Sequence, residues 1–98
     1  MFADLGLDNP DERLAKAKLA SAIGQIIDEG GWSQVEAAAL MGIDQPKVSK
    51  IVRGKLSEFS TERLVSFLMR LGSDVEIVVH RKPKKVGSPG SLKVAVVR

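Results

Sequence analysis

Four basic residues crowd a short stretch in the middle of the chain: Lys47, Lys50, Arg53 and Lys55. No acidic residue interrupts them between Gln45 and Leu56. Ammonium and guanidinium groups attract the phosphates of nucleic acids, and this attraction supplies most of the binding that does not depend on base sequence. The place of these charges is more informative than their sum, because a net charge of +3 is common among proteins that bind no polyanion. Their chemistry suits a nucleic-acid partner if the fold presents them on one surface.

The segment that carries these charges, residues 33–53, is predicted to form two short helices joined by a tight turn. Ala38 is small enough for the point where the two helix backbones cross. Gly42 follows four residues later, where the first helix must end in a left-handed conformation that costs glycine little. Val48 and Ile51 then return apolar side chains to the core. This shape lets a protein place its second helix in the major groove of DNA.

Both helices of the segment have N-terminal capping signals. Ser33 and Glu36 form an S-x-x-E capping box, in which each side chain satisfies the backbone N–H of the other residue. Asp44 is a preferred N-cap, and Pro46 falls in the first turn of the second helix, where a missing N–H does no harm. The second helix is therefore expected to begin near Gln45.

Two further helices are expected, one on each side of this segment. The sequence from Asn9 to Glu12 has a cap, a proline and early acids in their preferred places, and it starts a helix that we expect to run to about Asp28. Ser60 is expected to cap a last helix, which Gly72 ends. The apolar side chains of this last helix recur at helical spacing: Leu64, Phe67, Leu68 and Leu71.

The composition excludes several classes of function. Ninety-eight residues with 44% hydrophobic side chains make one small domain. The lack of cysteine excludes disulfides, thiolate zinc sites and cysteine nucleophiles. His80 is the single histidine and has no acidic or cysteine neighbour at ligand spacing, so we expect no metal, no cofactor and no catalytic residue. No apolar run approaches the length of about 18 residues that a membrane span needs, and the N-terminus is unlike a signal peptide, so we expect a cytoplasmic protein. Because no catalytic residue is indicated, we also expect that it is not an enzyme.

Beyond the last helix, apolar and polar residues alternate, which predicts a short β-strand within residues 73–81. Three apolar side chains would share one face of this strand: Val75, Ile77 and Val79. Its edges would be free unless it pairs with a second copy of the chain, with another protein, or with the weaker run from Leu92 to Val97. We prefer pairing in a homodimer.

The chain ends in a segment of different composition, residues 82–98. Lysine, proline, glycine and serine dominate its first half, which predicts a basic, flexible tail. Two interpretations stay open for its basic residues. They are either a solvated linker or a source of attraction to phosphates that does not depend on base sequence.

The segment from Trp32 to Gly54 resembles the phage-repressor-like helix-turn-helix, also called the XRE or Cro/C1 type. The residues that carry the resemblance are a Ser-Gln opening, Glu-Ala-Ala, Gly-Ile, the glutamine that starts the second helix, Val-Ser and Arg-Gly. The longer sequence over residues 30–79 is similar to the HigA-type antitoxin branch of that family. The resemblance covers about residues 11–81 and leaves the tail outside it.

This resemblance implies a fold and a division of the chain. We expect an all-α, λ-repressor-like compact helical bundle with a helix-turn-helix, followed by a short C-terminal strand that pairs in a dimer. Residues 1–9 would form a flexible N-terminal arm, and residues 10–72 would form the helix-turn-helix DNA-binding domain. Residues 73–81 would be the dimer or partner interface, and residues 82–98 would be the basic tail.

The resemblance also implies how the chain would meet DNA. In such domains the second helix of the motif lies in the major groove, while the first helix crosses the phosphate backbone. Four residues are then candidates for contacts to base edges: Gln45, Lys47, Ser49 and Lys50. Three more are candidates for contacts to phosphates: Gln34, Arg53 and Lys55. A glutamine amide can pair with adenine and a lysine can reach guanine, whereas the alternative is that all these side chains are merely solvated.

The function implied by the resemblance is that of a sequence-specific, dimeric repressor that binds a palindromic operator in double-stranded DNA. Such a repressor often acts on its own promoter, and a member of the HigA-type branch would also silence a toxin encoded beside it. The alternative is a protein-interaction module that binds a toxin or another partner through residues 75–79 and the tail. A small enzyme is not expected, because no acid–base pair, nucleophile or metal cluster appears in the sequence.

Overall fold

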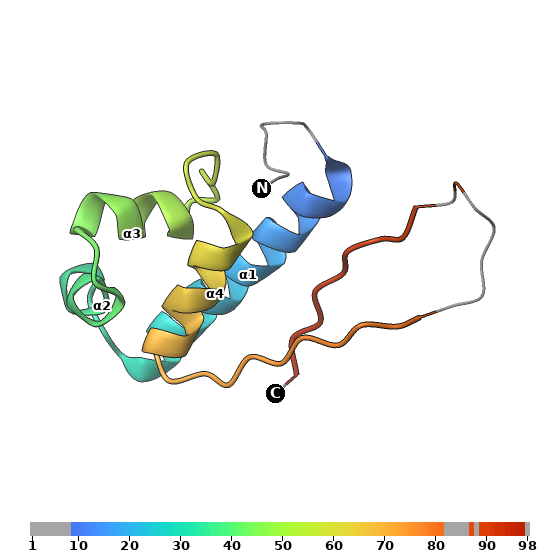
Figure 1. Cartoon of the computed structure of the whole chain (residues 1–98). Helices are drawn as coiled ribbons and strands as arrows, with labels where there is room; N and C mark the ends of the chain where they lie inside the picture. Colours follow the sequence, from blue (N-terminus) through green and yellow to red (C-terminus); the bar gives the residue numbers. More distant parts are fainter. Residues whose placement is uncertain (1–8, 82–86, 88, 98) are drawn as a thin grey trace.

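The computed structural model describes residues 9–81, 87 and 89–97. Within these residues the chain forms four helices: α1 (Pro10–Gly30), α2 (Gln34–Met41), α3 (Gln45–Val52) and α4 (Thr61–Arg70). The two longer helices, α1 and α4, lie side by side, and α2 and α3 pack across one end of them (Figure 1). The all-α helical bundle expected from the sequence is confirmed. No helix of the described part combines the length and the hydropathy needed to span a bilayer.

Local hydrogen bonds decide where α1 begins and ends. The Asn9 side chain accepts hydrogen bonds from the backbone N–H groups of Asp11 and Glu12, at 2.9 and 3.3 Å. Gly31 stops the helix in a left-handed conformation with a φ of 70°. The helix continues past the predicted end at Asp28, because the left-handed position falls on the second glycine of the Gly-Gly pair.

The predicted caps and turn of the helix-turn-helix are formed. The Ser33 hydroxyl accepts from the Glu36 N–H at 3.1 Å, and the Glu36 carboxylate accepts from the Ser33 N–H at 2.8 Å. Gly42 has a φ of 77° and its N–H donates back into the last turn of α2. The Asp44 carboxylate then accepts from the Lys47 N–H at 3.1 Å and starts α3. Short-range bonds therefore hold both ends of the turn and fix the direction in which α3 leaves α2.

The core that supports the motif contains the residues predicted for it. Ala38 is 5% exposed, and Val48 and Ile51 are 0% and 1% exposed, so α3 turns one face fully inward. The apolar stripe of α4 is buried as well: Leu64, Phe67, Leu68 and Leu71. In the loop before α4, the Phe59 ring is also buried and meets the Phe67 ring edge to face, with 6.2 Å between their centroids. This packing holds α3 against α1 and α2 against α4.

The segment that follows α4 differs from the predicted strand. Residues 74–81 are extended but form no strand, and among the described residues no backbone hydrogen bond joins them to residues 89–97. A strand needs a ladder of paired backbone groups, and the single chain supplies no such partner in its described part. Val75 packs against the core, whereas Ile77 and Val79 are 81% and 79% exposed. The strand over residues 73–81 is therefore corrected to an extended segment in the single chain, while its pairing in a dimer stays a prediction.

The described part of the tail returns along this segment. In Figure 1 the trace of residues 89–97 crosses that of residues 73–81 near the end of the chain. Residues 73–78 and 92–97 line one cavity together with side chains of α1 and α4. The Leu92 N–H donates to the Asp11 carboxylate at 3.3 Å, and Val94 packs against the core. The rest of the predicted tail, residues 82–86, 88 and 98, lies outside the described residues, as do residues 1–8 of the predicted N-terminal arm.

Candidate nucleic-acid interface

The two faces of α3 differ in chemistry. Its inward face consists of Val48 and Ile51, which are buried. The four residues predicted to contact bases lie on the rest of the helix together with Pro46 and Val52, with Gln45 exposed and three half-buried: Lys47, Ser49 and Lys50. One rigid helix therefore presents an amide, a hydroxyl and two ammonium groups to solvent.

The structure joins two predicted residues that belong to different helices. The Gln45 side-chain Nε2 donates a hydrogen bond to the Gln34 Oε1 at 2.6 Å. The two glutamines are the first residues of α3 and α2, so the bond connects the N-termini of both helices. A glutamine amide has two N–H donors and one carbonyl oxygen. Gln45 therefore keeps one donor and its acceptor for a ligand, while Gln34 limits the orientations that its amide can take.

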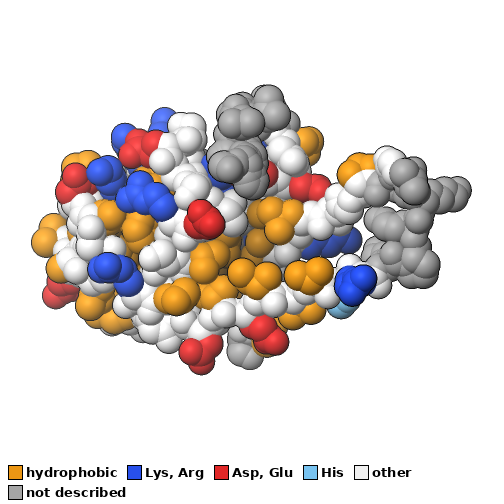
Figure 2. All heavy atoms as spheres, in the orientation of Figure 1, with side chains coloured by type: hydrophobic (Ala, Val, Ile, Leu, Met, Phe, Trp, Pro, Cys, Tyr) orange, Lys and Arg blue, Asp and Glu red, His pale blue; other side chains and the backbone are white. Residues whose placement is uncertain are grey.

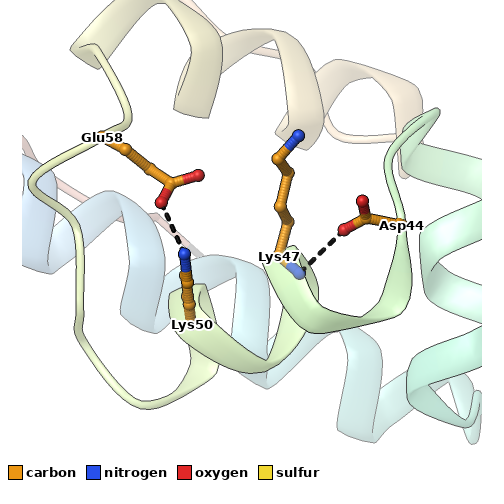
Figure 3. Close-up of polar contacts among 4 residues, drawn as sticks. All are labelled: Asp44, Lys47, Lys50 and Glu58. Carbon is orange, nitrogen blue, oxygen red and sulfur yellow. Dashed lines mark hydrogen bonds and ion pairs between the residues drawn. The ribbon is translucent and has the colours of Figure 1, made fainter.

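The Lys50 side chain has an acidic neighbour that sequence reasoning missed. Glu58, in the loop between α3 and α4, accepts a hydrogen bond from the Lys50 ammonium at 2.7 Å (Figure 3). This bond is the main cause that lowers the pKa of the Glu58 carboxyl, and the positive charges of Lys47 and Arg63 lower it further. Glu58 comes just after the run of basic residues. Nothing in the sequence except this closeness along the chain predicts that Glu58 contacts Lys50.

The other lysine of α3 is differently placed. The Lys47 side chain extends from the same helix without a bond to Glu58, and its backbone N–H is used by the cap at Asp44 (Figure 3). Within the described residues its ammonium has no hydrogen-bond or ion-pair partner. The Lys47 ammonium is therefore available to a ligand, whereas the Lys50 ammonium must first break its hydrogen bond to the Glu58 carboxylate.

The three predicted phosphate contacts lie near the ends of the motif helices. Arg53 follows α3 and its Nε donates to the Ser49 carbonyl at 3.4 Å, which keeps the guanidinium close to the helix. Gln34 and Arg53 both line a cavity of about 490 Å³ between α1 and the end of α3. Lys55 is exposed and does not line this cavity. Two of the three residues are thus brought together, and the third lies two residues further along the loop.

Basic, acidic and apolar side chains all reach the surface of the α2/α3 end, where Val35, Leu40 and Val52 are exposed. Figure 2 shows Lys and Arg side chains over the end of the molecule formed by α2 and α3, and hydrophobic side chains along the extended segments. In the part of the chain that the structure describes, no group of three His, Asp or Glu side chains could hold a metal ion. The site consists of hydrogen-bond donors and positive charge on a rigid helix, which suits binding to DNA.

Comparison with known proteins agrees with this geometry. A family model described as a helix-turn-helix domain matches residues 1–80. A solved structure described as an XRE family transcriptional regulator is similar with a TM-score of 0.75 and 44% identity, over 91% of this chain and 97% of that chain. No curated protein matches the sequence. The resemblance to XRE-type helix-turn-helix proteins is confirmed, and the HigA-type branch stays a prediction. The chain belongs to the helix-turn-helix domain family.

Proposed function

We propose that this protein is a sequence-specific DNA-binding transcriptional regulator that reads its operator with α3. The observation that carries the proposal is the division of α3 into a buried face, Val48 and Ile51, and a solvent face rich in donors. The helix lies at the end of the bundle where Figure 2 shows several Lys and Arg side chains among acidic and apolar ones. The similarity to an XRE family transcriptional regulator supports the same conclusion.

The glutamine pair supports a specific role for the start of α3. The free donor and acceptor of the Gln45 amide match the N7 acceptor and the N6 donor of adenine in the major groove. The Gln34 amide keeps its own donors, which suit a phosphate next to that base. Lys47, Ser49 and Lys50 would make the other contacts near base edges. Phosphate contacts by Arg53 and Lys55 would hold the helix in register.

Selection of bound sequences from random DNA duplexes tests this proposal. A sequence-specific regulator should enrich one sequence and bind it at least about 1,000-fold more tightly than unrelated DNA at the same salt concentration. Equal affinity for selected and unrelated duplexes would show that the protein binds DNA without reading it. No measurable binding to any duplex would contradict the proposal altogether.

We further propose that the regulator acts as a homodimer paired through residues 74–81. An antiparallel pairing centred on Ile77 places Val75 opposite Val79 of the partner subunit and Asp74 opposite His80 of the partner subunit. This alignment opposes the acidic first half of each segment to the basic second half of the other, whereas a parallel alignment opposes like charges. It also covers apolar side chains that are exposed in the single chain. A two-fold dimer would read a palindrome with half-sites about 34 Å apart.

A single-cysteine variant tests this pairing. The chain has no cysteine, so Ile77→Cys introduces the only thiol. Because the proposed two-fold axis passes through residue 77, mild oxidation should convert this variant to a disulfide-linked dimer that still binds the operator. Val35→Cys is a matched control, since Val35 is 67% exposed on α2, away from the extended segment. Equal cross-linking of both variants, or none at residue 77 in a protein that is dimeric in solution, would contradict the pairing.

Repression of its own promoter and restraint of a toxin are the finer parts of the proposal. They are supported by the resemblance of residues 30–79 to the HigA-type branch. In place of a second copy of the chain, a toxin would dock on residues 75–79 and the tail, where a cavity of about 620 Å³ lies between the extended segments, α1 and α4. A protein-interaction module without a regulatory role is the second candidate, and the exposed apolar side chains of this segment favour it.

Co-expression with the product of the adjacent gene tests the antitoxin role. The full chain should copurify with that product and relieve its toxicity, while a version ending at Gly72 should keep its helical circular dichroism and lose both effects. Binding by neither version would contradict the antitoxin role. Regulation of the gene's own promoter is tested separately, by a reporter whose expression should fall when the full chain is present.

A further inference from the structure

Glu58 stands among positive side chains of the proposed DNA-binding surface. Its carboxylate lies 2.7 Å from the Lys50 ammonium, and both side chains are partly open to solvent, with 39% and 43% of their surface exposed. The charges of Lys47 and Arg63 also act on this carboxylate. Figure 3 shows Glu58 reaching across from the loop to the solvent side of α3. An acid at this position opposes the binding of a polyanion, so it needs an explanation beyond packing.

We propose that Glu58 limits the affinity of α3 for DNA by holding the Lys50 ammonium away from phosphates and bases. Every duplex would have to displace the carboxylate from Lys50 before this lysine could contribute. The inference rests on the proposed function, because it describes how strongly the same helix binds DNA. Glu58 is a positioning residue in this account, since it acts through Lys50 and does not itself touch the ligand.

The size of the effect follows from the type of contact. An exposed ion pair contributes little, and its removal corresponds to about a two- to fivefold change in an equilibrium constant. Glu58→Gln should therefore tighten binding to all duplexes by about two- to fivefold at moderate salt. The gain should shrink as salt is raised, because salt screens the exposed ion pair that the variant lacks, so the slope of log K against log salt becomes slightly steeper. Operator and unrelated DNA should gain similar amounts, because the same ion pair is displaced in both complexes.

A direct contact of Glu58 with a base predicts the opposite result. A carboxylate can accept a hydrogen bond from the N4 amino group of cytosine in the major groove. In that case Glu58→Gln would weaken operator binding and leave the affinity for unrelated DNA unchanged. The ion pair with Lys50 favours the first account, because the carboxylate already has a strong partner on the protein.

The experiment measures binding of the full chain to its selected operator and to an unrelated duplex over a series of salt concentrations. Glu62→Gln is the matched control, because it removes the same charge from the first turn of α4 and Glu62 makes no ion pair within the described residues. Glu58→Gln should tighten both complexes and steepen the salt dependence, whereas Glu62→Gln should change either quantity less. Equal effects of the two variants would mean that Glu58 acts only through the net charge of the protein, and this result would overturn the inference.

A double-mutant cycle separates action through Lys50 from all other effects. In a Lys50→Gln background, Glu58→Gln should no longer tighten binding or change the salt slope. The same gain in both backgrounds would overturn the inference while leaving DNA binding intact. Loss of operator binding on Glu58→Gln would overturn it in favour of a base contact. Failure of the unmodified protein to bind any duplex would instead overturn the proposed function and this inference with it.

Discussion

Removal of either amide of the Gln34–Gln45 pair tests the proposed base contact. Gln45→Ala deletes the group that would pair with adenine, and Gln34→Ala deletes the acceptor that orients it. Gln45 is exposed and Gln34 is only half-buried, so neither truncation opens a cavity in the core. Each should lower the free energy of unfolding by no more than about 1.5 kcal/mol, the contribution of the hydrogen bond that it removes. A change in DNA binding would therefore reflect the interface and not the fold.

The expected losses differ in size and are not additive. A bidentate contact to a base is worth about 1–3 kcal/mol, so Gln45→Ala should weaken operator binding by about 5- to 150-fold. The hydrogen bond from Gln45 to Gln34 is worth about 0.5–1.5 kcal/mol, which gives about a 2- to 12-fold loss for Gln34→Ala. Because both changes act on one contact, the double variant should lose about as much specificity as Gln45→Ala alone.

The assay is fluorescence anisotropy with the selected operator and an unrelated duplex at one salt concentration. The informative quantity is the ratio of the two affinities, because any phosphate contact made by Gln34 affects both duplexes and cancels. Thermal unfolding of each variant provides the control for stability. An unchanged ratio in Gln45→Ala would refute the base contact, and fully additive losses in the double variant would refute the orienting role of Gln34.

Three further changes have expected outcomes. Arg53→Ala should weaken operator and unrelated DNA by a similar factor and lower the slope of log K against log salt by about 0.9, as measured by anisotropy; a sequence-dependent loss would contradict its role at phosphate. Ile51→Ala should lower the free energy of unfolding by about 2–5 kcal/mol in urea titrations, because the side chain is 1% exposed, and a loss below 1 kcal/mol would contradict its place in the core. The pKa of Glu58 is lowered from its ordinary 4.5 by the bond from Lys50, so its stabilising contribution is present above pH 4.5 and disappears as the pH falls through the lower value of the folded state. Urea unfolding should therefore show a stability difference between the unmodified protein and Glu58→Gln that is constant near neutral pH and shrinks in acid, and a difference that grows in acid would contradict the ion pair.

The limits of what sequence can predict are clearest at the C-terminal segment. Alternation of apolar and polar residues identified residues 73–81 as extended, but alternation does not supply a ladder partner. In the single chain, Val75 reaches the core and the following apolar side chains do not. The contact between Leu92 and Asp11 links residues at opposite ends of the chain, and no local pattern predicts it.

The sequence by itself determined the features that depend on near neighbours. The caps at Ser33 and Asp44 and the left-handed turn at Gly42 involve residues within about four positions of one another, so local rules suffice to predict them. The buried positions of α3 follow from helical periodicity, since Val48 and Ile51 fall on one face whatever the partner helix is. These features allowed the helix-turn-helix to be predicted from the sequence alone.

Only the tertiary structure decided which functional side chains meet. The bond between Gln34 and Gln45 depends on the angle between two helices, and the bond between Lys50 and Glu58 depends on the path of a loop. Both contacts join side chains at the surface. Surface positions tolerate many residue types, so no periodic pattern in the sequence marks such a contact. The sequence therefore determined the helix that is offered to DNA, while the packing of its neighbours decided which groups on that helix are oriented and which are restrained.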